Sequence, residues 1–275
     1  MKRKILTLLA IIFVSICYSQ TDTIFSNNQK ISCSVKEITP EAVKYSYVGE
    51  DLINSIYKNT VQKIVFKSGR VQTFAEATSF KNIADVSDYE NVSISQVESE
   101  VRGLFKVGDV SSKAKGTTTL SNQERVKERA YRKIKMQAAI MGANVIYITN
   151  QRSDGNKQGG YYQSGSSSET SLSGVAYTNQ LPDFEEFKSV IKGRKNFKAV
   201  YEYKLYSSSS EMSEKSLKCD FTILKITNEN GLIMLSADLP DTYDDTKFRV
   251  VSFDKTKFNI FYEDKNTVYN IEISL

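Results

Sequence analysis

Short runs in which apolar and polar residues alternate follow one another from residue 20 to residue 76, and they predict β-strands. Side chains of a strand point alternately to its two faces, so a half-buried strand shows a period of two. Turn-forming pairs such as Pro40-Glu41 and Gly49-Glu50 separate the runs. We therefore expect a small curved sheet or barrel over residues 20–76, with strands at 21–25, 30–38, 42–48, 52–57, 61–66 and 71–74, followed by a polar connector at 77–90.

A different period marks the middle of the chain. Between residues 121 and 141, apolar residues recur at spacings of three and four, as on one face of an amphipathic helix. Ser121 and Glu124 form the pattern of a capping box, in which each side chain satisfies a free amide at the helix start. Gly142 follows as a left-handed C-terminal cap. The residues expected on the buried face are Val126, Ala130, Ile134, Ala138 and Met141.

This helix leads into a short apolar strand at 144–149, so we expect residues 91–206 to form one αβ domain. Residues 151–173 are rich in glycine, serine and other polar residues. We interpret them as a mobile loop, because such a composition buries little apolar surface. The loop is either a neutral insertion or a partner-contacting loop with Tyr161 and Tyr162 as anchors. A return strand at 172–177 and a strand at 199–206 complete the expected domain.

Serines at 207–210 are typical of a flexible linker. Beyond them, residues 211–275 alternate again and predict an antiparallel β-meander, with strands at 217–227, 232–237, 247–253, 257–262 and 267–274. The strand at 257–262 is apolar on both faces, which favours a two-layer sandwich or a partial barrel. The whole chain is thus expected to be a strand-dominated α+β protein with a β-barrel-like N-terminal module, a central αβ module with one long amphipathic helix, and a C-terminal meander.

The run Ala138-Ala139-Ile140-Met141-Gly142-Ala143-Asn144-Val145-Ile146 resembles a helix-to-strand junction, Ala-Ala-x-x-Gly-Ala-Asn-x-Val, of small αβ domains in bacterial envelope proteins. The Rcs stress-sensor lipoprotein family and YbjQ-like domains carry similar runs, and residues 105–110 resemble the strand that precedes their helix. The resemblance covers residues 100–150 and implies an envelope αβ module, not a catalytic site. The disulfide framework of the Rcs family is absent, so its signalling role is not carried over. By strand count and turn spacing, residues 20–76 resemble SH3-like or Sm-like barrels.

The first twenty residues have the pattern of a secretory signal peptide. Lys2, Arg3 and Lys4 precede an apolar run at 5–16, and small or polar residues follow. The run is shorter than the roughly 20 residues that a membrane span needs. Cleavage is expected after Ser19, which makes the protein periplasmic or secreted. A competing interpretation is a lipobox in which Cys17 becomes a lipidated first residue, although Ile16 occupies a position that normally holds a smaller side chain.

The leader also accounts for most of the net charge. The whole chain carries 37 basic and 32 acidic residues, a net charge of +5. Loss of the three basic leader residues leaves 34 against 32, a net charge of +2. Proteins that bind nucleic acid carry a concentrated basic surface. The global charge therefore gives no reason to expect a nucleic-acid partner.

The chain contains no histidine. Histidine is the side chain that titrates nearest neutrality and the commonest metal ligand, so its absence excludes Ser-His-Asp and Cys-His catalysis and the usual zinc sites. No motif for a carboxylate pair, a Ser-Lys nucleophile or a phosphate-binding glycine loop is present. The sequence therefore predicts a non-enzymatic protein without a cofactor.

Two charged groups have alternative interpretations. Asp241, Asp244 and Asp245 could supply oxygen ligands to calcium outside the cell, or form a solvated turn. On the expected helix, a basic face could meet an acidic protein partner or anionic lipid headgroups, or be only the solvated side of the helix. The residues of that basic face are Arg125, Arg129, Arg132 and Lys133.

Two cysteines remain after the leader, Cys33 and Cys219, and alternation places both sulfur atoms on the apolar face of a strand. An oxidising compartment would permit a disulfide between them, and two small hydrophobic side chains in separate cores are the other interpretation. Together these observations favour an exported, non-catalytic envelope protein that acts as an interaction or assembly module. The alternative function is transport of a small apolar ligand or lipid in the C-terminal sheet domain.

Cleavage after Ser19 predicts that the exported protein carries no fatty acid. Cells grown with a radioactive fatty acid should yield an unlabelled mature protein, and Cys17→Ala should leave both processing and export unchanged. Label in the native protein that disappears in Cys17→Ala would instead establish the lipobox.

Overall fold

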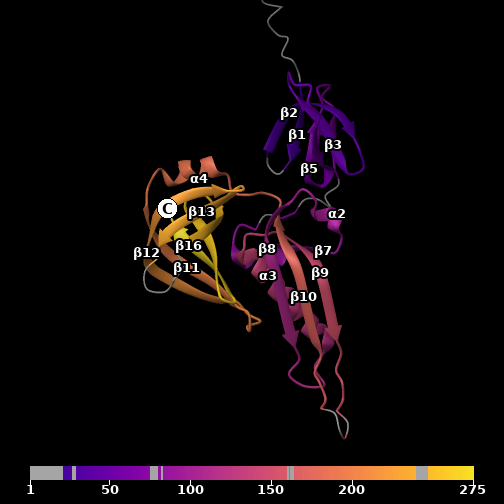
Figure 1. Cartoon of the computed structure of the whole chain (residues 1–275), viewed down its shortest axis with the longest axis vertical. Coiled ribbons are helices and arrows are strands. Elements are labelled where there is room, and N and C mark those ends of the chain that lie inside the picture. Colours follow the sequence, from indigo (N-terminus) through magenta and orange to yellow (C-terminus); the bar gives the residue numbers. More distant parts are fainter. Residues whose placement is uncertain are drawn as a thin grey trace, which may run out of the picture. The chain divides into compact units, whose positions relative to one another are not determined.

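A computed structural model describes residues 21–26, 29–74, 80–81, 83–159, 161, 164–239 and 247–275. The chain divides into two compact units, residues 1–78 and 79–275 (Figure 1). Strands account for 53% of the structure and helices for 17%, which confirms a strand-dominated α+β protein. The leader, with Cys17, lies outside the described residues.

The N-terminal unit is one antiparallel sheet in the order β4-β3-β2-β1-β5-β6. All six predicted strands are present, because alternation and turn residues place them locally. Strands β4 and β6 form the two edges, so the sheet is open. The sequence alone had allowed either a small curved sheet or a barrel. Its elements are β1 (Asp22–Ser26), β2 (Gln29–Ile38), β3 (Ala42–Tyr47), β4 (Asn54–Tyr57), η2 (Lys58–Thr60), β5 (Val61–Val65) and β6 (Val71–Thr73).

A buried carboxylate and a buried thiol mark the core of this unit. Asp22 accepts hydrogen bonds from the Val35 and Lys67 amides, each at 2.8 Å, and so fixes β1 to its neighbours. Cys33 is 1% exposed. Burial, and then the charge of Asp22, raise the pKa of its thiol to about 11. Neither Cys33 nor Cys219 forms a disulfide, and both pack against apolar cores of their own units.

In the second unit, a four-stranded sheet in the order β7-β9-β10-β8 has the long helix α3 packed on one face (Figure 1). The predicted apolar stripe of this helix is buried, since Val126, Ala130, Ile134, Ala138 and Met141 all lie in one core cluster. The elements before the barrel are η4 (Val86–Asn91), β7 (Ser93–Ser95), α2 (Glu98–Val101), β8 (Phe105–Lys115), α3 (Gln123–Ile140), β9 (Val145–Asp154) and β10 (Glu169–Thr178).

The two ends of α3 test the predicted caps. The N-cap is Asn122, whose side chain accepts a hydrogen bond from the Arg125 amide, so the capping box of Ser121 and Glu124 is wrong. The Ser121 hydroxyl accepts instead from the Thr118 amide in the preceding turn. At the other end, Gly142 has a φ of +74°, which confirms it as the left-handed residue that ends the helix.

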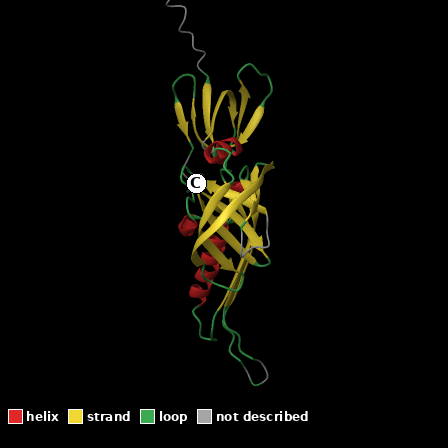
Figure 2. Cartoon of the chain, turned by 90° about the vertical axis from the view of Figure 1, so that its left-hand side faces the viewer, coloured by secondary structure: helices red, strands yellow, loops and turns green. Residues whose placement is uncertain are grey.

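The C-terminal strands form a closed six-stranded barrel (Figure 2). Its interior is filled by aromatic side chains, and Phe187 of α4 packs with its ring 5.5 Å from that of Phe258. The five predicted strands are present, and the sheet closes where the sequence suggested a sandwich or partial barrel. The elements are α4 (Phe184–Ile191), β11 (Asn196–Tyr206), β12 (Ser213–Glu229), β13 (Leu232–Asp238), β14 (Lys247–Phe253), β15 (Lys257–Asp264) and β16 (Thr267–Ser274).

Three predicted boundaries are wrong. Strand β11, assigned to the αβ domain, pairs with both β12 and β16 and closes the barrel. Residues 207–210 therefore lie in a hairpin connection between β11 and β12, not in a linker. Residues 151–154 and 169–173 of the expected mobile loop extend β9 and β10, because β8 pairs with β10 as far as Glu169 and satisfies its backbone.

A buried guanidinium joins the barrel to the αβ part of this unit. Arg249 of β14 donates from Nη1 to the Val107 carbonyl on β8 at 2.5 Å and from Nη2 to the Met141 carbonyl at 2.8 Å. The second acceptor belongs to the C-terminal end of α3, which attracts positive charge. Burial lowers the pKa of Arg249 to about 10, so it stays charged at neutral pH.

Amide and apolar contacts extend this joint. Asn270 of β16 donates to the Ile140 carbonyl at 3.0 Å and accepts from the Asn259 amide at 2.9 Å. Three barrel residues, Tyr203, Leu205 and Val268, lie in the same core as the apolar face of α3. The barrel and the αβ part are therefore one packed body. The prediction of a serine linker between two separate domains did not include this packing.

We expect Arg249→Met to destabilise the protein by about 2–4 kcal/mol, because two buried carbonyls lose a charged donor while the apolar stem is kept. Chemical denaturation followed by circular dichroism measures this loss. Arg125→Met, at an exposed position of α3, is the control and should change stability by less than about 0.5 kcal/mol. Equal effects of the two variants would show that the joint contributes little.

Gly142→Ala should cost about 1–2 kcal/mol more than Gly193→Ala in the same measurement. Both glycines have positive φ, +74° and +71°, so the backbone penalty is shared. A Cβ on Gly142 would lie 2.8 Å from Val251 Cβ, whereas nothing lies within 4 Å of one on Gly193. Similar losses in both variants would mean that β14 moves away at little cost.

Candidate functional site

One side of the four-stranded sheet carries the first candidate surface. Buried residues of β8 and β10 face α3, so the residues between them point to the opposite side, which we call the outer face. The strand registers place its residues in cross-strand rows. Each row holds one residue from β8, one from β10 and one from β9, in that order. The rows are Asp109, Val175 and Tyr147; Ser111, Ser173 and Asn150; Lys113, Ser171 and Arg152; and Lys115, Glu169 and Asp154.

The polar rows of the outer face are charged and largely exposed. Lys113 forms an ion pair with Glu169 at 2.7 Å, and Arg152 forms one with Asp154 at 2.8 Å. The Arg152 side chain is 75% exposed. Exposed pairs of this kind contribute little to stability, so their charges remain available to a partner. Tyr147, Val175 and Tyr177, on the same face, are half-buried and supply an apolar area beside the charges.

The free edge of β9 adjoins this face. Strand β7 pairs only with Val145, Ile146 and Tyr147, so in the described structure no strand covers β9 between Ile148 and Asp154. Beyond the strands, the connecting loop is tied at its base by paired backbone bonds between Lys157 and Ser166. Tyr161 in this loop is 95% exposed, as a contact anchor requires, while Tyr162 lies outside the described residues.

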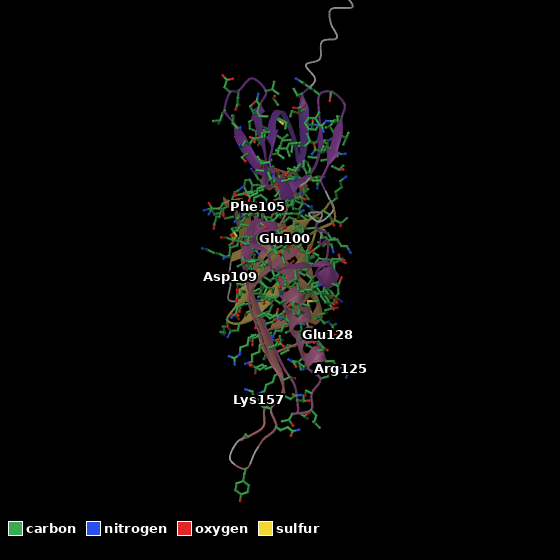
Figure 3. The ribbon with its side chains drawn as sticks, turned by 90° about the vertical axis from the view of Figure 1, so that its right-hand side faces the viewer. Glu100, Phe105, Asp109, Arg125, Glu128 and Lys157 are labelled. Atoms are coloured by element: carbon green, nitrogen blue, oxygen red, sulfur yellow. The ribbon has the colours of Figure 1, made fainter. Side chains whose placement is uncertain are left out.

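Three of the four residues of the predicted basic face of α3 are exposed, and Lys133 is not. Arg125 is exposed and lies with Glu128 on the helix in Figure 3. Arg129 donates to the Lys115 carbonyl at 2.8 Å, and Arg132 donates to the Tyr89 hydroxyl at 3.0 Å. Lys133 is only 5% exposed, so its assignment to a solvated face is wrong. Its position is explained by the barrel, which packs over that side of the helix.

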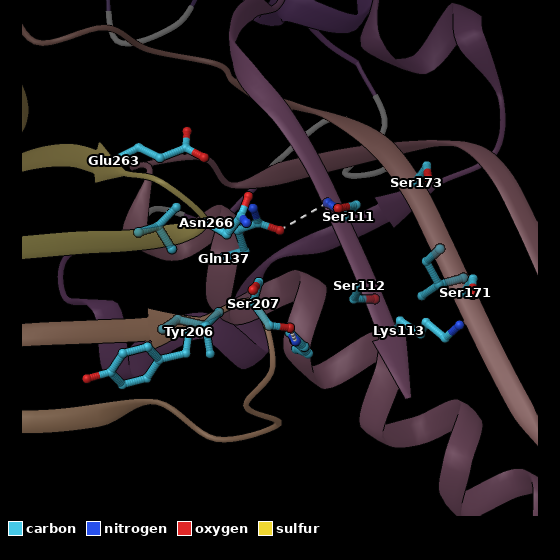
Figure 4. Close-up of a pocket in the computed structure, with 14 residues that line it drawn as sticks. Ser111, Ser112, Lys113, Gln137, Ser171, Ser173, Tyr206, Ser207, Glu263 and Asn266 are labelled. Carbon is cyan, nitrogen blue, oxygen red and sulfur yellow. Dashed lines mark hydrogen bonds between the residues drawn. The ribbon is translucent and has the colours of Figure 1, made fainter. Parts of the chain in front are cut away.

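A cleft of about 350 Å³ lies between β8, β10 and α3 and two barrel hairpins (Figure 4). Lys133 is one of its lining residues, and we call this space the Lys133 cleft. Lys133 donates to the Ser207 carbonyl, and burial lowers the pKa of its amine. Gln137 accepts from the Ser111 amide at 3.0 Å. The other lining residues are Ser112, Lys113, Ser171, Leu172, Ser173, Leu205, Tyr206, Glu263, Asn266 and Val268.

The N-terminal unit carries an exposed apolar loop that sequence reasoning did not single out. Val48, Leu52 and Ile53, between β3 and β4, are 59%, 68% and 61% exposed. The signal was present in the sequence, since apolar residues flank the polar turn Gly49-Glu50-Asp51. Three neighbouring apolar side chains in water mark a second place where a partner could bind.

The calcium candidates Asp241, Asp244 and Asp245 lie outside the described residues. Among the residues that the structure does describe, no group of three or more acidic or cysteine side chains is arranged to hold a metal ion. The described helices include none that is long and apolar enough to cross a membrane.

Comparison with known proteins identifies no relative. No protein-family description matches the chain, and neither a curated protein nor a solved structure matches it significantly.

Proposed function

We propose that this protein is an exported, non-catalytic recognition module of the cell envelope that binds a protein partner through the outer face and the adjoining edge of β9. The observation that carries the proposal is the composition of this face. It combines a half-buried apolar area, from Tyr147, Val175 and Tyr177, with exposed charged and hydroxyl side chains. Protein interfaces have this arrangement of an aromatic centre and a polar rim.

The edge of β9 gives the face a way to bind an extended segment. From Ile148 to Asp154 its outer backbone groups have no strand partner in the described structure. An added strand from a partner would hydrogen-bond there, while the outer face contacts alternate side chains of that strand. Short β7 leaves this length of edge open, and charged Arg152 and Asp154 discourage unspecific pairing.

Three sequence features support the remaining parts of the proposal. The leader pattern at 1–19 supports export. The junction at Ala138–Ile146 resembles envelope αβ domains. The absence of histidine from the chain supports a role that does not depend on catalysis.

Transport of an apolar ligand in the barrel is the weaker candidate. Barrels that hold a small ligand have about eight strands or more, and this one has six. Phe197, Phe221, Phe248 and Phe258 lie in its core, and the last three are fully buried. Side chains therefore occupy the interior that a lipid would need.

Site-specific photo-crosslinking in cells tests the proposal. A photoreactive residue at Arg152 of the full-length, tagged protein should capture one dominant protein, identified by mass spectrometry. The matched control is a probe at Lys225, an exposed position on the barrel strand β12, which should capture far less of that protein.

The partner captured at Arg152 should bind the purified protein, and Tyr177→Ala should weaken that binding by about tenfold, the usual range for an aromatic anchor. Thermal unfolding of Tyr177→Ala checks that the fold is intact. Equal capture at Arg152 and Lys225, or unchanged affinity in a folded Tyr177→Ala, would contradict the proposed surface.

A further inference from the structure

The Lys133 cleft contains a buried cation whose bonding is incomplete. A lysine ammonium has three donors and no acceptor. In the described structure Lys133 uses one of them, to the Ser207 carbonyl, and takes part in no ion pair. Burial of an ammonium is costly unless an anion or several acceptors compensate for lost water. Two donors of this amine are therefore not used by a protein group of the described structure and border the cleft.

The other charged groups around the cleft do not supply an anion for these donors. The carboxylate of Glu169 is paired with Lys113 on the outer face and forms no ion pair with Lys133. Glu263 lines the mouth and is exposed, but it forms no ion pair with the amine. The buried residues Leu205 and Val268 also line the cleft, and apolar lining of this kind strengthens the attraction for an anion.

The remaining lining residues present polar groups suited to hydroxyls. Gln137 uses its Oε1 for the Ser111 amide, and the donors of its amide nitrogen face no described acceptor. The Ser207 hydroxyl is likewise unused within the described structure, whereas Ser171 and Ser173 lie on the outer face of the sheet. Tyr206, 44% exposed, adds an aromatic ring at the rim. A volume of about 350 Å³ is at the small end of ligand pockets.

We propose that the Lys133 cleft binds a small polyhydroxylated anion of monosaccharide size, with its phosphate or carboxylate on Lys133 and its hydroxyls on the Ser207 hydroxyl and the Gln137 side-chain amide. This site is separate from the partner surface at the β9 edge, although Lys113, Ser171 and Ser173 border both. The hydrogen bond from Lys133 to Ser207 holds the β11–β12 connection at the cleft, so the bound anion and this hairpin would share one amine.

Isothermal titration of the full mature protein with glucose 6-phosphate, glucuronate, inorganic phosphate and uncharged glucose tests the site. We expect saturable binding of glucose 6-phosphate or glucuronate, and at least about tenfold weaker binding of glucose, because a charge-assisted hydrogen bond is lost. The better of the two anionic sugars identifies the preferred charged group. If inorganic phosphate binds and neither anionic sugar does, the cleft recognises a simple anion, and the proposal is overturned.

Lys133→Met should weaken binding of the preferred sugar at least about tenfold, because it keeps the apolar stem and removes the charge. Lys113→Met is the matched control, on the same cleft but already paired with Glu169, and should weaken binding by less than about threefold. If Lys133→Met does not fold, carbon-13 spectra of lysine-labelled native protein give a second readout, since the ligand should shift the Lys133 signal. No binding at millimolar sugar, or equal binding in a folded Lys133→Met, would overturn the site.

The two proposals fail separately. If both proposals are correct, the Lys133→Met variant loses sugar binding, and its crosslinking at Arg152 is unchanged. Crosslinking that disappears in Lys133→Met, with no sugar bound by the native protein, would mean that Lys133 only supports the fold of the partner surface.

Discussion

The second unit depends on the contact between Arg249 and two backbone carbonyls. The barrel supplies the guanidinium, and the carbonyls of Val107 and Met141 come from an edge strand and from the end of α3. These acceptors are groups that a helix end and a sheet edge leave unsatisfied. A planar guanidinium can reach both at once, and its charge suits the negative end of the helix. One side chain thus satisfies a carbonyl at the helix end and a carbonyl at the β8 edge.

This joint decides which surfaces remain open. The barrel covers the end of α3 and one edge of β8, and it buries Lys133 against the β11–β12 hairpin. The polar rows of the outer face stay largely exposed, and no described strand covers the far edge of β9 beyond Tyr147. Both candidate sites therefore rest on strands and a helix held by a packed core, not on independent loops. A rigid support of this kind reduces the conformational entropy that is lost on binding.

Local patterns predicted the strands well, and long-range pairing explains the errors. Alternation and turn residues located all six strands of the first unit and five barrel strands. The Asn230-Gly231 turn, with both residues at positive φ, is an example that sequence shows directly. Nothing local shows that β11 pairs with β16, nearly at the other end of the unit. The burial of Lys133 could not be predicted for the same reason, because Ser207, whose carbonyl it contacts, lies 74 positions further along the chain. Arg249 was missed because its two acceptors are backbone atoms far along the chain.

The buried cations Arg249 and Lys133 differ in how far groups of the protein itself satisfy their hydrogen-bond donors. Arg249 has two carbonyl acceptors, and its guanidinium lies 4.7 Å from the centre of the Phe261 ring, so the protein itself compensates for its burial. The Lys133 side chain is also buried, but its amine borders an open cleft and has one carbonyl acceptor. The proposed anion would complete the bonding of this amine, and because Lys133 also donates to Ser207, it would link the ligand to the barrel hairpin.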